Sequence, residues 1–186
     1  MKIEEIAANI LSEIRNAINI VNEKEVDKFV NKIFSSKRIF VAGAGRSGIL
    51  IKAFAMRLMQ MGFETYVVGE TTTPAIREDD LLVLISGSGE TEYSYHILKT
   101  ARKVGACSYL ITARRDSRMG KIACGKIVIP GPTKVSPQKR DENVAQVLGS
   151  LFEQAAFILL ECILEKIARR INIQHEDILI RHANLE

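Results

Sequence analysis

The chain has 186 residues, of which 47% are apolar, and it carries a formal net charge of +4. This length suits a single domain, 1–186, with a sizeable core. No apolar run approaches the roughly 20 residues of a membrane-spanning helix, and the N-terminus carries acidic residues that are not typical of a signal or transit peptide. The basic residues are dispersed rather than gathered in a nucleic-acid-binding stripe. We therefore expect a cytoplasmic protein that contacts neither membranes nor nucleic acid.

Hydrophobic periodicity predicts two N-terminal helices, 3–21 and 25–34, followed by alternating strands and helices. The predicted strands are 37–42, 65–68, 81–85, 108–112 and 126–129. The predicted later helices are 48–61, 92–104, 117–123, 143–170 and 175–182, with a polar loop at 131–142. The strands are mostly continuous apolar runs, as expected when helices cover both faces of a sheet. The pattern predicts an α/β fold, with a doubly wound, flavodoxin-like, five-stranded parallel sheet of order 2-1-3-4-5 flanked by helices.

The spacing of the cysteines and histidines argues against a disulfide framework or a metal site. These residues are Cys107, Cys124, Cys162, His96, His175 and His182. The cysteines are odd in number, far apart and beside apolar runs, which is typical of buried free thiols. The histidines lack the short spacing of metal ligands. We expect neither a metal nor a cofactor.

A loop rich in glycine and hydroxyl groups follows the third predicted strand. Its sequence is Ser86-Gly87-Ser88-Gly89-Glu90-Thr91. Backbone N–H groups, hydroxyls and the partial positive charge of the next helix's N-terminus can all face one anion there. The loop has no lysine, so it is not the nucleotide-binding P-loop. We predict that it binds a single phosphate group on a small molecule.

The first predicted strand ends in a second glycine-rich turn, Gly43-Ala44-Gly45-Arg46-Ser47-Gly48. The turn fits the G-x-G-x-x-G fingerprint of dinucleotide-binding proteins, and Glu70 lies near the expected position of a ribose-binding acid. However, the chain is short for a cofactor half plus a substrate half. Arg46 and Ser47 also stand where dinucleotide sites usually have small residues. We therefore favour a phosphate pocket over a dinucleotide site.

In the predicted strand order, the two glycine-rich loops meet at the switch point of the sheet, where open α/β sheets bind ligands. One pocket would gather the hydroxyls of Ser47, Ser86, Ser88 and Thr91 near two helix N-termini. The alternative is that these hydroxyls are ordinary turn and helix-cap groups.

The long predicted helix has two apolar faces. One stripe, expected to pack on the domain, comprises Val144, Val147, Leu148, Leu151, Ala155, Ile158, Leu159 and Cys162. A second stripe, expected to face another subunit, comprises Glu153, Phe157, Leu160 and Leu164. At the head of this second stripe, Glu153 is a candidate proton shuttle. The alternative is an ordinary solvent-facing glutamate.

Both glycine-rich loops and the long helix resemble the sugar isomerase (SIS) domain family, whose members bind phosphosugars. More narrowly, the chain resembles the 6-phospho-3-hexuloisomerase family along essentially its whole length. The segments that carry this resemblance are 54–59, 68–74, 80–91 and 181–185.

The resemblance implies interconversion of D-arabino-hex-3-ulose 6-phosphate and D-fructose 6-phosphate, a step of the ribulose monophosphate pathway that fixes formaldehyde. It also implies a metal-independent homotetramer with active sites near subunit interfaces. Glu153 and His182 would be catalytic, the latter from a neighbouring chain, whereas Arg46, Ser47 and the loop 86–91 would bind substrate. The alternatives are another SIS isomerase acting on a different sugar phosphate, and a non-catalytic phosphosugar-binding module.

Overall fold

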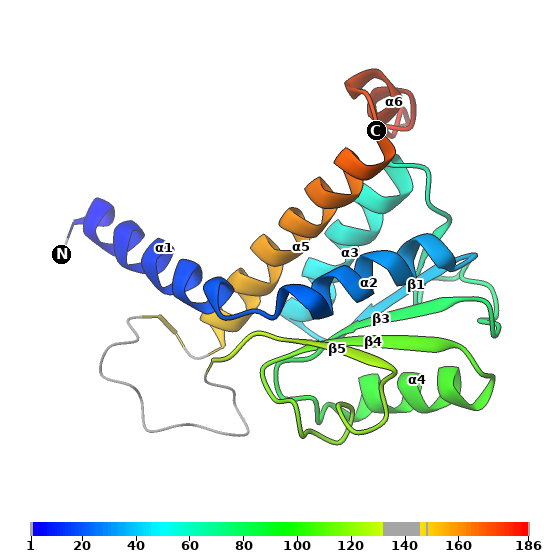
Figure 1. Cartoon of the computed structure of the whole chain (residues 1–186), viewed down its shortest axis with the longest axis horizontal. Coiled ribbons are helices and arrows are strands. Elements are labelled where there is room, and N and C mark those ends of the chain that lie inside the picture. The colour runs from blue at the N-terminus through cyan, green and yellow to red at the C-terminus, as the bar shows by residue number, and fades with distance from the viewer. Residues whose placement is uncertain (1, 132–145, 148, 186) are drawn as a thin grey trace.

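A computed structural model describes residues 2–131, 146–147 and 149–185 (Figure 1). The strands are β1 (Ile39–Gly43), β2 (Thr65–Val67), β3 (Leu81–Ile85), β4 (Cys107–Thr112) and β5 (Gly125–Val128). The helices are α1 (Ile3–Asn19), α2 (Glu23–Ser35), α3 (Arg46–Gln60), α4 (Glu92–Lys103), α5 (Ser150–Ile171) and α6 (His175–Ile180). The strands form one parallel sheet in the order β2-β1-β3-β4-β5. The predicted fold class and strand order are confirmed.

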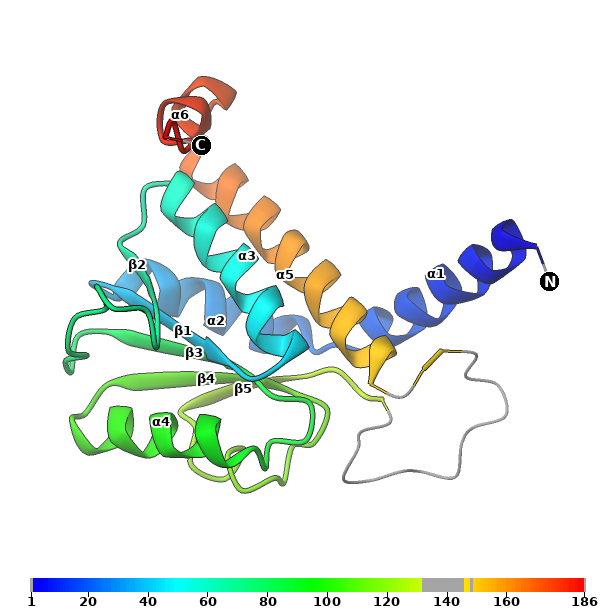
Figure 2. The ribbon, with the colours of Figure 1, turned by 180° about the vertical axis from the view of Figure 1, so that it is seen from behind.

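Helices cover both faces of the sheet, with α2, α3 and α5 on one face and α4 on the other (Figures 1 and 2). The alternation of side chains along β3 explains the two cores. Leu81, Val83 and Ile85 pack into the cluster beneath α2, α3 and α5. Leu82 and Leu84 pack into the cluster beneath α4. Because both faces are buried, the strand is apolar at every position, as the sequence indicated.

Two predicted helices differ from the observed elements. The helix expected at 117–123 is absent, and this segment forms a series of turns. The long helix begins at Ser150 rather than near residue 143, since residues 146–147 are not helical. Residues 143–145, and the predicted loop 131–142 beyond its first residue, lie outside the described ranges.

The two apolar stripes predicted for α5 are also wrong in part. Leu160 and Leu164 were expected to face another subunit, yet they are buried in the chain's own core. Ile158 and Cys162 were expected to pack on the domain, yet both are exposed. The reason is that α1, α2 and α3 all contact α5, so that the buried sector is broad. Val147 is exposed, and Val144 and Leu148 lie outside the described residues.

The cysteines are less buried than their apolar surroundings predict. Cys107 is half-buried, Cys124 and Cys162 are exposed, and all three are free thiols. Cys107 is the first residue of β4 and Cys124 precedes the edge strand β5, so that both lie at the margin of the sheet.

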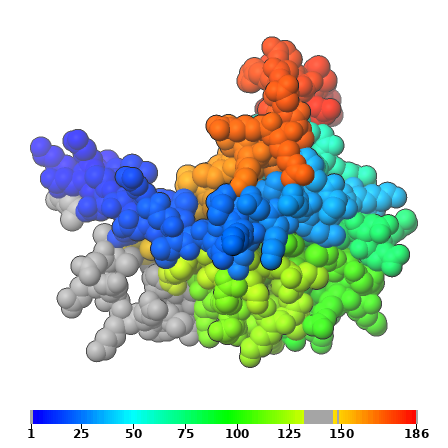
Figure 3. All heavy atoms as spheres, viewed as in Figure 1, coloured from blue at the N-terminus to red at the C-terminus, as the bar shows by residue number. Residues whose placement is uncertain are grey.

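Two helices project from the body of the molecule (Figure 3). Only Ile14 and Ala17 of α1 are buried, whereas Ile3 and Leu11 are 80% and 66% exposed. The short helix α6 stands at the opposite end of α5 from its N-terminus (Figure 1). Among the described residues, no helix has the length and apolar character needed to cross a membrane.

Candidate functional site

The first wall of the site is the turn between β1 and α3, where the backbone folds back very tightly. A Cβ atom at Gly43 would lie 2.9 Å from the backbone nitrogen of Gly48, and one at Gly48 would lie 2.8 Å from the Gly43 carbonyl oxygen. Only glycine permits this approach of strand and helix. The turn delivers Arg46 and Ser47 to the first turn of α3.

The second wall is the turn between β3 and α4, which is held by its own hydroxyls. Ser86 Oγ accepts a hydrogen bond from the Gly89 N–H at 3.2 Å and lies 3.3 Å from Thr91 Oγ1. Ser88 Oγ accepts from the Glu90 N–H at 3.2 Å. Thr91 is the N-cap residue of α4, so the turn ends at a helix N-terminus.

The two turns and the start of α5 enclose a cavity of about 200 Å³. It is lined by Ala44, Gly45, Arg46, Ser47, Gly87, Ser88, Thr91, Gly149, Phe152 and Glu153. Three helices, α3, α4 and α5, begin at this cavity. Helix N-termini attract anions because their first N–H groups lack intrahelical acceptors. Together with the hydroxyls, these N-termini make the cavity suitable for a phosphate group.

A carboxylate stands at the rim of the same cavity. Glu153 lies in the first turn of α5 and forms an ion pair through Oε2 with Nε of Arg46. The Glu153 side chain is 19% exposed, whereas that of Arg46 is 63% exposed. A second hollow of about 200 Å³, lined by Ile14, Leu50 and Phe157 among others, also includes Arg46 and Glu153. The ion pair therefore stands between a polar cavity and a more apolar one.

The structure separates the predicted binding residues into two groups. Arg46, Ser47, Ser88, Thr91 and Gly87 line the cavity with Glu153. Ser86, Gly89 and Glu90 are not among its lining residues; they hold the turn and attach it to its neighbours.

The predicted catalytic residue His182 is distant from this cavity within one chain. It is exposed just beyond α6, which stands at the C-terminal end of α5 (Figure 1), whereas Glu153 lies in the first turn of α5. The helix from Glu153 to Ile171 alone spans about 27 Å. His182 can reach a cavity of this kind only in another copy of the chain.

The segment 117–119, whose contacts the sequence did not predict, packs against the turn between β3 and α4. Ser117, fully buried, packs so closely on Gly89 that a Cβ there would lie 2.0 Å from Ser117 Oγ. The Met119 N–H donates to the Gly89 carbonyl oxygen at 3.1 Å. The Arg118 N–H donates to Glu90 Oε1 at 3.0 Å, and its guanidinium lies 3.8 Å from the centre of the Tyr95 ring. These contacts fix the turn to the segment that follows β4.

The start of α5 is a second feature that sequence reasoning missed. Gly149 caps the helix with a φ of 89°, a left-handed conformation that favours glycine. Phe152 packs against Gly87 of the turn between β3 and α4. The dipeptide Gly149–Ser150 was the available signal, since glycine and serine are common at helix N-termini.

Other hollows and clusters differ in character from this site. A cavity of about 280 Å³ between α4 and the sheet includes His96, yet its lining is mostly apolar. Within the described ranges, no three histidine, cysteine or acidic side chains converge in a manner suited to a metal ion.

Comparison with known proteins identifies the family. The SIS domain family matches residues 32–149. An uncharacterised protein of Archaeoglobus fulgidus is 43% identical, covering 95% of this chain and 97% of that protein. The 3-hexulose-6-phosphate isomerase of Bacillus subtilis is 38% identical over the full length of both chains.

A solved structure agrees with these matches. The crystal structure of a Methanococcus jannaschii protein, reported to infer a 3-hexulose-6-phosphate isomerase function, superimposes with a TM-score of 0.81. The two chains are 35% identical, with 99% of this chain and 100% of that chain covered. The full-length matches confirm the narrower resemblance predicted from the motifs. The chain belongs to the SIS domain family.

Proposed function

We propose that this protein is a sugar-phosphate isomerase that interconverts D-arabino-hex-3-ulose 6-phosphate and D-fructose 6-phosphate. The full-length relatives named 3-hexulose-6-phosphate isomerase support the substrate. The observation that supports the chemistry most directly is the cavity in which three helix N-termini and several hydroxyls lie beside the Glu153 carboxylate.

In this proposal the phosphate binds between the two glycine-rich turns. Ser47, Ser88 and Thr91 donate hydroxyl hydrogen bonds, and the N-termini of α3 and α4 contribute backbone N–H groups. The phosphate is remote from the reacting carbons, so that its binding energy serves to position them.

Glu153 is proposed to carry the proton between the two reacting carbons. In the forward direction its carboxylate takes the proton from C2 of the 3-ketose, which leaves a cis-enediolate across C2 and C3. A second proton moves from the hydroxyl on C2 to the oxygen on C3, and return of the first proton to C3 then places the carbonyl at C2. One carboxylate on one face of the sugar can make both transfers. Arg46, already in contact with Glu153, is placed to stabilise the enediolate oxygen.

The proposed assembly is a homotetramer whose active sites lie near subunit interfaces. The exposed apolar residues of α1 and the hollow beside Glu153 support a neighbouring chain at this position. His182 of that chain would complete the site. We also propose that the whole chain, 1–186, acts as one domain, because α5, which extends beyond the matched range, supplies Glu153. The expected setting is the cytoplasm, since a charged sugar phosphate does not cross a membrane unaided.

An assay of fructose 6-phosphate formation from the 3-hexulose phosphate tests the activity. Glu153→Gln tests the base: kcat should fall by at least ~10²-fold while substrate binding is largely retained. Glu161→Gln on the outer face of α5 is a matched control, because it removes a carboxylate from the same helix away from this cavity. Near-normal turnover of Glu153→Gln would exclude Glu153 as the base. Absence of any isomerisation by the wild-type protein would overturn the proposed activity itself.

A further inference from the structure

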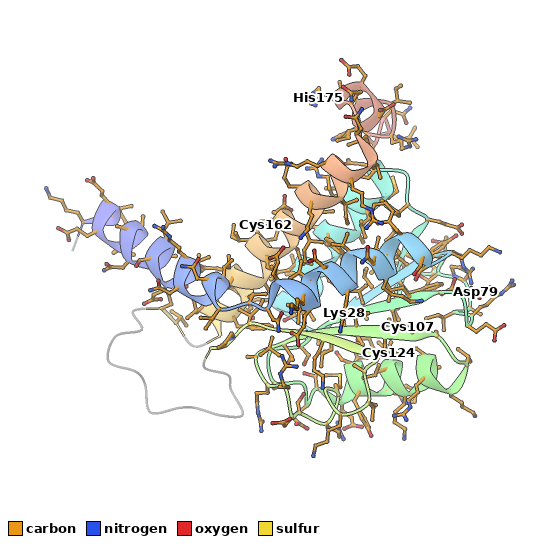
Figure 4. The ribbon with its side chains drawn as sticks, viewed as in Figure 1. Lys28, Asp79, Cys107, Cys124, Cys162 and His175 are labelled. Carbon is orange, nitrogen blue, oxygen red and sulfur yellow. The ribbon has the colours of Figure 1, made fainter. Side chains whose placement is uncertain are left out.

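Two thiols lie together at the amino-terminal ends of β4 and β5. The candidate site lies at the other end of the strands, where β1 and β3 finish. Cys107 begins β4 and Cys124 immediately precedes β5; Figure 4 shows them near each other beneath α2, with Cys162 apart on α5. The Cys107 thiol interacts with Cys124. Ser108 places its backbone N–H at 3.3 Å from Cys124 Sγ and its hydroxyl at 3.9 Å. Cys124 Sγ therefore has two donors from Ser108 beside it.

The surroundings of Cys124 are mainly cationic. A hollow of about 190 Å³ is lined by Glu25, Lys28, Tyr109, Arg115, Cys124, Gly125 and Lys126. Arg115 neutralises Glu25 through a 2.7 Å ion pair, and Lys28 and Lys126 add positive charge. On α2, Lys32 also acts on the thiol pair. Donors and nearby cations favour a thiolate over a thiol.

The two thiols differ in acidity as this geometry predicts. Partial burial alone would raise the pKa of Cys124, but the Ser108 N–H, Cys107 and the Ser108 hydroxyl together bring it below its ordinary value. Burial, followed by the hydrogen bond and charge of Cys124, raises the pKa of Cys107 to about 11. Cys124 is thus the more acidic thiol of the pair, and Cys107 is the less acidic one.

We propose that Cys124 is a modification site for peroxide-class oxidants and that Cys107 captures the oxidised residue as an intramolecular disulfide. The Cys124 thiolate attacks one peroxide oxygen, forming an S–O bond as the O–O bond breaks. The departing alkoxide or hydroxide takes a proton from solvent. Cys124 is oxidised to a sulfenic acid and the peroxide is reduced.

The second step uses the neighbouring thiol. Oxidation removes the negative charge of Cys124 that helped to hold the proton on Cys107. Cys107 sulfur attacks Cys124 sulfur, so that the S–S bond forms as the S–O bond breaks. Hydroxide leaves with the proton that Cys107 gives up, as water.

Peptide mapping of the wild-type protein tests the proposal without any variant. The protein is treated with hydrogen peroxide at neutral pH, blocked with an alkylating agent and digested with trypsin. We expect the peptides 104–114 and 122–126 to be found joined, and to separate after reduction with dithiothreitol. Cys162 is a built-in control, because it is exposed on α5 without a neighbouring thiol. Cys124 should be alkylated roughly tenfold or more faster than Cys162 at pH 7.

Two variants in a Cys162→Ser background separate the steps. In Cys107→Ser, Cys124 should accumulate a sulfenic acid that dimedone traps. In Cys124→Ser, Cys107 should remain reduced under the same treatment. The proposal is overturned if no joined peptide forms, if Cys162 reacts as fast as Cys124, or if Cys107 is oxidised without Cys124.

Discussion

Two serines in the same turn have opposite surroundings, and this difference predicts different phenotypes. Ser88 lines the cavity, whereas Ser86 is buried beneath the turn. If Ser88 donates to the substrate phosphate, Ser88→Ala should raise KM by roughly 10–100-fold, the cost of a lost hydrogen bond to a charged group. kcat should change little, because the hydroxyl is remote from the reacting carbons. Steady-state kinetics on purified protein measures both quantities.

Ser86→Ala is the matched comparison within the turn. Ser86 Oγ shares the buried Gly89 N–H with the Ser86 carbonyl oxygen, and the loss of an intramolecular hydrogen bond costs about 0.5–1.5 kcal/mol. We therefore expect a lower free energy of unfolding, measured by urea titration, with a smaller effect on KM than that of Ser88→Ala. An unchanged stability combined with a large increase in KM would reverse the roles assigned to the two serines.

The sequence predicted which residues lie near the cavity, but it could not predict which of their side chains face into it. Ser47, Ser88 and Thr91 were predicted because parallel strands bring their carboxyl ends together, whereas Glu153 was predicted because it heads an apolar stripe of the long helix. Ser86 carries the same hydroxyl as Ser88, and only the folded turn determines which of them faces the cavity. The partnership of Arg46 with Glu153 was not predicted either, because it depends on where α5 begins.

Among the elements, the segment that follows β4 fixes the position of the turn between β3 and α4. Gly89→Ala meets two obstacles: a φ of 66° and the close contact with Ser117 Oγ. A strained residue costs of order 1–3 kcal/mol, so we expect a loss of stability together with a raised KM. Thermal unfolding and steady-state kinetics check the two effects.

A double substitution separates the two obstacles. Gly89→Ala with Ser117→Gly removes the atoms that block the new Cβ, but the left-handed backbone remains. The pair should recover part of the stability lost by Gly89→Ala, as expected for residues in contact. If the two substitutions are simply additive, Ser117 does not support the turn.

Elements with strong periodicity were predictable, and those that depend on local hydrogen bonds were not. The strands were found because they contain short apolar runs, which in β1 and β3 are buried on both faces. The predicted helix 117–123 contains apolar residues, but Ser117 Oγ instead accepts from the Gly120 N–H at 3.1 Å and closes a turn. Gly120 was the signal, since glycine is a poor helix former. The faces of α5 were misjudged because its packing partners come from distant parts of the chain.

For the molecule as a whole, one buried ion pair predicts how stability depends on pH. Asp80 is fully buried and accepts from Arg38 Nε at 3.0 Å and Nη2 at 2.6 Å, and from the Arg77 N–H at 2.7 Å. Burial alone would raise the pKa of Asp80, but these hydrogen bonds and the charge of Arg38 bring it below its ordinary value. The stabilisation is therefore present above the unfolded-state pKa of about 3.9 and is lost as the pH falls through the lower, folded-state pKa.

Asp80→Asn should reveal this dependence. It leaves Arg38 buried without its counter-ion, which costs about 3–5 kcal/mol at neutral pH. The difference from the wild type should stay constant from pH 7 to about 5 and narrow below about 4. Urea titrations at fixed protein concentration and ionic strength measure it. Asp79→Asn is the control, since its exposed side chain should produce little change at any pH. A constant difference down to pH 3 would contradict the pKa direction.

The arrangement of α5 and α6 leads to a test of the whole assembly. Because Glu153 lies in the first turn of α5 and His182 follows α6, beyond the other end of α5, a site that uses both must be built from two chains. His182→Ala and Glu153→Gln should each lower kcat by at least roughly 10²-fold.

When the two variants are produced together with different tags and purified through both tags, some sites receive an intact Glu153 from one chain and an intact His182 from another. With random pairing, activity should return to about a quarter of the wild-type value. Hybrids as inactive as their parents would show that the two residues do not share a site, and full activity of His182→Ala alone would remove this residue from the mechanism.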